Sequence, residues 1–142
     1  MRFWDSSALV PLIVEERRSV ACRKLFRSDP VVGVWLLTRI EIVSSLRRKE
    51  RAGEMHRAEI VAALRRLEIA HGRWTEVDEF ALVSDYAERL LATHPLAAAD
   101  ALQLGAALVL ANGQARRREF VSSDEQLAAA AEIEGFSVIV PL

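Results

Sequence analysis

The stretch Arg2-Phe3-Trp4-Asp5-Ser6-Ser7-Ala8-Leu9-Val10 joins a short strand pattern to an apolar helix pattern, with an acidic residue at the junction. A second stretch, Phe120-Val121-Ser122-Ser123-Asp124, repeats this arrangement near the other end of the chain. In parallel α/β sheets, ligands bind beyond the carboxyl ends of the strands. Both stretches therefore predict an acid at the ligand-binding edge of such a sheet.

The rest of the chain continues the alternation of short β-type runs with longer helical patterns. Strands are expected at residues 2–4, 31–35, 74–77, 119–122 and 138–140. Helices are expected at residues 7–14, 18–27, 38–52, 54–71, 79–93, 96–111 and 124–134. Asp78 is expected to cap a helix and Pro95 to occupy a first helical position. The alternation predicts a three-layer α/β/α sandwich around a mostly parallel sheet of about five strands, formed by residues 1–142 as one domain.

The composition is typical of a globular protein and excludes a disulfide scaffold. Of 142 residues, 51% are hydrophobic and 27% are charged, and Cys22 is the only cysteine. One cysteine can form neither an internal disulfide nor a thiolate metal site. The longest apolar stretch, residues 96–111, is shorter than a membrane span, and charges in the first 16 residues interrupt any signal-peptide core. We expect a cytoplasmic protein that does not enter the membrane.

Asp100 lies in a helix pattern that is apolar nearly all round. Such a helix is buried, and burying an unpaired carboxylate is unfavourable. Within one helical turn only Gln103 is polar, and it supplies an amide rather than a cation. A metal ligand is therefore the favoured interpretation, and a carboxylate satisfied by distant hydrogen bonds or by an arginine is the alternative.

The other three acids each have a structural alternative. Glu41 ends the sequence Thr38-Arg39-Ile40-Glu41, which taken alone favours a capping box at a helix start. Asp5 is placed to cap a helix, and Asp124 is placed in a first helical turn, where the helix dipole favours an acid. However, Ser6 or Ser7 can replace Asp5 as the cap, and Ser123 with Gln126 can form a capping box near Asp124. Both aspartates are then free to face a cation.

If the fold brings these four carboxylates together, their mutual repulsion requires an outside cation. Hard oxygen ligands suit Mg²⁺ or Mn²⁺, and such ions support phosphodiester chemistry. The net charge of −1 conceals basic runs at residues 47–51, 65–66 and 116–118. These runs are solvated helix faces and loops, or they bind a nucleic-acid backbone.

Four short motifs have the order and spacing of the motifs of a known protein family. They are Phe3-Trp4-Asp5-Ser6-Ser7-Ala8-Leu9, Thr38-Arg39-Ile40-Glu41, Ala99-Asp100-Ala101-Leu102-Gln103 and Val121-Ser122-Ser123-Asp124. With them the chain resembles the PIN domain, and specifically the toxin subunit of VapBC toxin–antitoxin pairs. The resemblance covers essentially the whole chain. It implies that Asp5, Glu41, Asp100 and Asp124 are the catalytic and metal-binding residues, with Ser7 and Ser122 as supporting hydroxyls.

The resemblance also implies an endoribonuclease activity, a homodimer, and neutralisation by a small antitoxin that places a basic side chain in the acidic pocket. One rival stays open, namely a catalytically silent domain that binds RNA or protein through the same pocket. A phosphoacceptor domain is disfavoured because it requires a lysine after a late strand, and Lys24 and Lys49 are the only lysines. An aspartyl phosphatase requires a second acid where Ser7 stands.

Overall fold

The computed structural model describes all residues, 1–142. Five strands lie at β1 (Arg2–Trp4), β2 (Val32–Trp35), β3 (Thr75–Val77), β4 (Glu119–Val121) and β5 (Ser137–Ile139). Seven helices lie at α1 (Ser6–Ile13), α2 (Ser19–Ser28), α3 (Thr38–Arg51), α4 (Arg57–His71), α5 (Phe80–Thr93), α6 (Ala98–Leu110) and α7 (Glu125–Ile133). Every predicted element is present, with boundaries within three residues of the prediction.

The five strands form one parallel sheet in the order β3-β2-β1-β4-β5. The predicted parallel sheet is therefore confirmed. From the central strand β1 the chain adds β2 and β3 on one side, and then returns to add β4 and β5 on the other side. The boundary between β1 and β4 is consequently the switch point of the topology, where α/β sheets bind their ligands.

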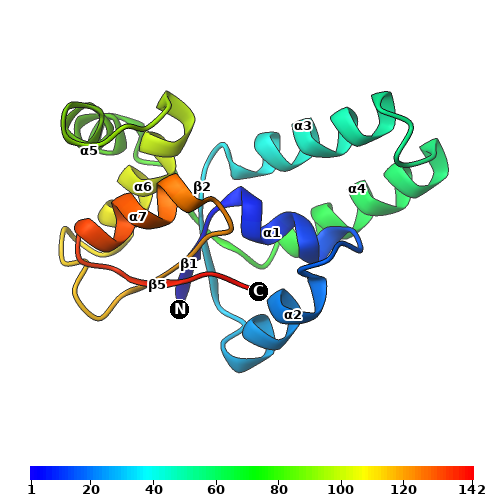
Figure 1. Ribbon diagram of the computed structural model, residues 1–142, viewed down its shortest axis with the longest axis horizontal. Coiled ribbons are helices and arrows are strands. Elements are labelled where there is room, and N and C mark those ends of the chain that lie inside the picture. The colour runs from blue at the N-terminus through cyan, green and yellow to red at the C-terminus, as the bar shows by residue number, and fades with distance from the viewer.

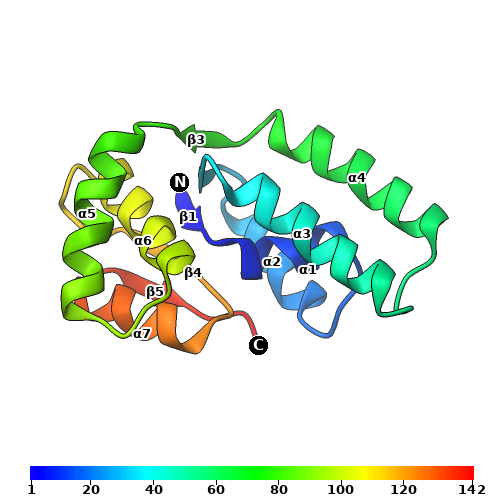
Figure 2. The ribbon, with the colours of Figure 1, turned by 90° about the horizontal axis from the view of Figure 1, so that it is seen from above.

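Helices cover both faces of the sheet, as predicted for a three-layer sandwich. Figure 1 shows α1–α4 to the right of the sheet and α5–α7 to the left. Strand residues alternate between these layers: Phe3 and Phe120 pack in the core with α5–α7, whereas Trp4 and Val121 pack in the core with α1–α4. Seen from above, α3 and α4 form a hairpin that extends away from the sheet (Figure 2).

Helix α6, which carries Asp100, packs against its neighbours more closely than a side chain would allow. A Cβ added at Gly105 would lie 2.9 Å from the carbonyl oxygen of Val83 on α5. A Cβ added at Gly33 on β2 would lie 2.5 Å from a methyl carbon of Leu110 on α6. These two glycines therefore allow α6 to lie tightly between α5 and the sheet, which fixes the position of Asp100.

Two predicted helix starts are wrong. Helix α5 is capped by Glu79 rather than Asp78, and α6 begins at Ala98 rather than Pro95. The residue before a proline is restricted to extended backbone, and His94 has φ −132° and ψ 149°. Pro95 therefore ends α5 instead of starting α6. None of the helices combines the length and the apolar character that a membrane-spanning segment requires.

Candidate active site

Asp5 and Asp124 follow the adjacent strands β1 and β4, at the switch point of the sheet. The register pairs Trp4 with Val121, and the Asp5 amide donates to the Val121 carbonyl at 3.0 Å. The residues that come directly after these two strands are thereby brought together from opposite ends of the chain. This part of the sequence-based prediction, that both acids lie at the carboxyl edge of the sheet, agrees with the structure.

The Asp5 side chain is 3% exposed and is held by three hydrogen bonds. Ser7 Oγ donates to Oδ1 at 2.7 Å, Ser122 Oγ donates to Oδ2 at 3.0 Å, and the Ala8 amide donates to Oδ1 at 3.3 Å. Burial raises the pKa of Asp5 from 3.8 to about 7; these hydrogen bonds oppose the rise, and the charge of Asp124 adds to it. Asp5 is thus a fixed carboxylate whose charged form lacks a compensating cation.

The Asp124 side chain forms one hydrogen bond within the protein, as a helix cap. Its Oδ1 accepts from the Leu127 amide at 2.8 Å, its own amide donates to Ser122 Oγ at 3.0 Å, and Oδ2 accepts no hydrogen bond. The free oxygen is consistent with a role toward a ligand. The Asp124 charge raises the pKa of both Asp5 and Asp100, so both lie within its electrostatic reach.

The expectation that serines cap these two helices is wrong. Asp5 caps α1 and Asp124 caps α7, each with its own side chain. The two serines donate to carboxylates instead: Ser6 Oγ donates to Glu41, and Ser7 Oγ donates to Asp5. Each aspartate therefore uses one oxygen for the cap.

Glu41 does not form the capping box that its sequence favours. Helix α3 starts at Thr38 with Leu37 as the cap residue, and the cap has no side-chain hydrogen bond. The Glu41 carboxylate instead accepts from Ser6 Oγ at 2.9 Å and from Gln103 Nε2 at 3.0 Å. Burial raises the pKa of Glu41, these two bonds oppose the rise, and the charge of Asp100 adds to it.

Asp100 is half-buried near the start of α6, and its carboxylate forms no hydrogen bond and no ion pair with any residue. Burial raises the pKa of Asp100, and the charge of Asp124 raises it further. The alternative that an arginine or distant hydrogen bonds satisfy this acid is therefore wrong. Its position leaves both oxygens available to a ligand.

The charge of Asp124 acts on Asp5 and Asp100, and the charge of Asp100 acts on Glu41, so each of the four carboxylates lies within electrostatic reach of at least one other. None of them belongs to an ion pair. No three His, Cys, Asp or Glu side chains converge closely enough to enclose a metal ion by themselves. Mg²⁺, however, usually keeps several waters and takes only one or two carboxylates, so this donor set fits such an ion without a preformed cage.

Two residues that position the acids were not predicted as site residues. Ser6 and Gln103 hold the two oxygens of Glu41, and Gln103 Nε2 also lies 3.1 Å from Thr38 Oγ1. Gln103 is fully buried. A buried amide three residues after Asp100 on an apolar helix was a usable signal, since buried polar groups are hydrogen-bonded.

A family model described as PIN domain matches residues 2–134. The matched range contains the four carboxylates and both supporting serines. No curated protein matches the sequence.

Solved structures with the same fold cover nearly the whole chain. A toxin–antitoxin complex from Klebsiella pneumoniae has a TM-score of 0.68 at 16% identity, covering 100% of this chain and 98% of that one. FitAcB from Neisseria gonorrhoeae has a TM-score of 0.70 at 16% identity, covering 99% and 98%. VapC20 from Mycobacterium tuberculosis, described as a Sarcin-Ricin loop cleaving toxin, has a TM-score of 0.60 at 24% identity, covering 92% and 95%. At these identities the similarity shows a shared fold.

Proposed function

Because the chain belongs to the PIN domain family, we propose that it is an endoribonuclease that hydrolyses RNA phosphodiester bonds with the help of Mg²⁺ or Mn²⁺. The observation that carries the proposal is a group of four electrostatically coupled carboxylates, two of them at the switch point of the sheet, none of which is neutralised by a protein cation. Such a group is electrostatically unfavourable without a cation.

Asp5 and Asp100 would be the principal metal-binding residues, with Glu41 and Asp124 completing the set directly or through water. A divalent ion bound there would lower the pKa of a water and stabilise charge on the phosphate. Ser7 and Ser122 keep Asp5 in one orientation by donating to its two oxygens. Hydrogen-bonded neighbours of this kind orient metal-binding carboxylates.

The test is cleavage of RNA by Asp5→Asn and Asp100→Asn in Mg²⁺, each compared with wild type and with wild type in EDTA. Both variants should lose cleavage and keep the wild-type circular dichroism spectrum. Asp85→Asn, at an exposed position on α5, is the matched control and should cleave at the wild-type rate. Cleavage by Asp100→Asn at the wild-type rate would refute the assignment. RNA binding without cleavage by the wild type would favour the silent-domain alternative.

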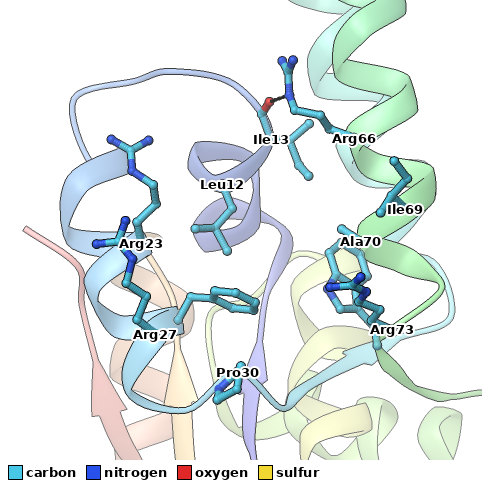
Figure 3. Close-up of a pocket in the computed structure, with 11 residues that line it drawn as sticks. Leu12, Ile13, Arg23, Arg27, Pro30, Arg66, Ile69, Ala70 and Arg73 are labelled. Atoms are coloured by element: carbon cyan, nitrogen blue, oxygen red, sulfur yellow. Dashed lines mark hydrogen bonds between the residues drawn. The ribbon is translucent and has the colours of Figure 1, made fainter.

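We further propose that the protein is the toxin of a toxin–antitoxin pair, supported by its likeness to structures from such systems. A groove of about 510 Å³ lies between α1, α2 and α4, remote from the carboxylates. Figure 3 shows its apolar floor, including Leu12, Ile69 and Ala70, with arginines on both sides. An apolar groove of this kind suits the apolar face of a partner segment.

The arginines around this groove favour an acidic partner. Arg27 and Arg73 form no ion pair and no side-chain hydrogen bond, and Arg66 donates only to the Ile13 carbonyl, at 2.7 Å (Figure 3). Arg23 is paired with Glu15 at 2.8 Å. Three cations are thus free to meet carboxylates, so the proposed antitoxin segment is amphipathic, with an apolar face flanked by Asp or Glu.

The partner proposal is tested by co-expression with a candidate antitoxin, a small protein with an amphipathic acidic segment of this kind. A complex should survive gel filtration and should be lost in the double variant Arg27→Glu, Arg73→Glu, while the double variant Arg116→Glu, Arg118→Glu, at exposed positions outside the groove, serves as the charge-matched control. A complex that tolerates both reversals would place the partner elsewhere. The homodimer implied by the resemblance remains a prediction, and sedimentation velocity of the isolated protein measures it.

A further inference from the structure

A second cleft of about 570 Å³ begins at Glu41, the one site carboxylate that lines it, and follows α3 away from the sheet. Ser6, Ser7 and Glu41 line its inner end, and Ser44, Ser45 and Arg48 continue its wall. Residues three or four positions apart share one face of a helix, so Glu41, the two serines and Arg48 form a single row on α3. The cleft therefore leads from the acidic site to a cation.

Three polar side chains of the outer wall are free, whereas Lys49 and Glu16, which also line the cleft, are paired with each other. The hydroxyls of Ser44 and Ser45 and the guanidinium of Arg48 form no side-chain hydrogen bond, and Arg48 forms no ion pair. Its neighbours differ: Arg47 is paired with Glu50 at 3.2 Å, and Lys49 is paired with Glu16 at 2.8 Å. Of these three consecutive basic residues, only Arg48 has its charge available to a ligand.

The spacing and chemistry of the row suit a phosphate backbone. Glu41 and Arg48 lie seven positions apart on the helix, which corresponds to about 10 Å along its axis. Hydroxyl and guanidinium donors are the usual partners of phosphate oxygens. No aromatic side chain lines the cleft, so it offers no platform on which a base can stack.

We propose that Ser44, Ser45 and Arg48 bind a phosphate of the RNA strand adjacent to the bond that is cut. This inference rests on the proposed nuclease function, because it assigns part of the same substrate to a neighbouring subsite. Arg48 supplies the charge and the serines supply neutral hydrogen bonds. Such contacts fix the register of the strand and carry no sequence information, so the choice of RNA target is made outside this cleft.

The experiment measures binding of a fluorescein-labelled single-stranded RNA by anisotropy in Mg²⁺ at several KCl concentrations. It uses the full chain with Asp100→Asn, so that the RNA is not cut. Adding Arg48→Ala should weaken binding about fivefold or more and reduce the slope of log affinity against log salt by about 0.7, the value for one released counterion on a single strand. Arg48→Lys should retain the slope, and the double variant Ser44→Ala, Ser45→Ala should weaken binding without changing it.

Arg51→Ala is the matched control, because Arg51 is exposed on the same helix, is unpaired and lies outside the cleft. Equal affinity and slope for Arg48→Ala and Arg51→Ala would overturn the inference. The inference would also be overturned if Arg48→Ala weakened the binding of a polyglutamate peptide but did not weaken the binding of RNA. Cleavage is measured separately on the chain with wild-type carboxylates. If RNA binding depends on Arg48 but the wild-type chain does not cleave RNA, the nuclease proposal is refuted and the phosphate site is supported. If the wild-type chain cleaves RNA but Arg48→Ala binds RNA as well as the Arg51→Ala control does, the nuclease proposal is supported and the phosphate site is refuted.

Discussion

Replacing Asp5 by Asn should stabilise the metal-free protein at alkaline pH. Asp5 is buried, and its pKa in the folded protein is about 7, compared with 3.8 as its ordinary value. An acid whose pKa is raised by folding contributes stability while it is protonated in both states. As pH rises through the unfolded and then the folded pKa, that contribution is lost. Wild-type stability should therefore fall between about pH 4 and pH 7, and Asn removes this loss.

The magnitude follows from the size of the shift. Each pKa unit corresponds to about 1.4 kcal/mol, so the full loss is on the order of 4 kcal/mol above pH 7. Between pH 5 and the folded pKa of about 7, the loss of stability corresponds to about two pKa units. The stability difference between Asp5→Asn and wild type should thus be about 3 kcal/mol larger at pH 8 than at pH 5.

The pocket offers a hydrogen-bond partner to each polar atom of an asparagine side chain. Its Oδ1 can accept from Ser7 Oγ and from the Ala8 amide, as the aspartate does now. Its Nδ2 can donate to Ser122 Oγ, whose own proton can turn toward the Asp124 carbonyl at 3.4 Å. The substitution therefore removes a buried charge. The second N–H of Nδ2 has no partner among these groups, at a cost of about 1–3 kcal/mol. That cost is the same at both pH values, so the growth of the advantage with pH is unchanged.

The assay is urea unfolding in EDTA at pH 5 and pH 8, followed by tryptophan fluorescence. Asp85→Asn, which removes an exposed charge, is the control and should show no comparable gain. If Asp5→Asn were no more stable than wild type at pH 8, or if its advantage did not grow with pH, the account of Asp5 as an uncompensated buried acid would be refuted.

Three further predictions concern the same region. Mg²⁺ at about 100 times its dissociation constant should raise wild-type stability by about 2.7 kcal/mol. The gain should be much smaller in Asp100→Asn, as measured by thermal denaturation with and without Mg²⁺ and in EDTA. Gln103→Leu removes the amide that orients Glu41 and should weaken Mg²⁺ binding roughly tenfold by calorimetry; unchanged affinity would show that Ser6 alone suffices. Gly105→Ala should destabilise by about 1–3 kcal/mol because its Cβ meets the Val83 carbonyl, whereas Gly72→Ala, with helical φ of −63° and only ordinary contacts, should be neutral or slightly stabilising in urea.

Local patterns in the sequence determined the elements and the position of each acid along them. Strand and helix periodicities depend on residues close in the chain, so all twelve elements were predicted with small boundary errors. The same patterns placed Asp5 and Asp124 directly after strands and Asp100 in a buried helix. These positions require no knowledge of which strands are neighbours.

The tertiary structure decided which groups surround each carboxylate. Asp and Ser cap helices about equally well, so the sequence could not choose between Asp5 and its neighbouring serines; the choice depends on Glu41, which lies 35 positions from Ser6 and accepts its hydroxyl. Thr38 likewise lost its capping role because its hydroxyl accepts from the Trp35 amide and meets Gln103.

The strand order was also beyond the sequence. Ser122 donates to Asp5 across 117 positions, and this contact exists only because β4 lies beside β1 rather than beside β3. Pairing between strands far apart in the chain is set by the packing of the helices that cover the sheet, to which the local pattern of each strand contributes little. The chain thus specified four acids at particular element ends, and the fold made neighbours of them.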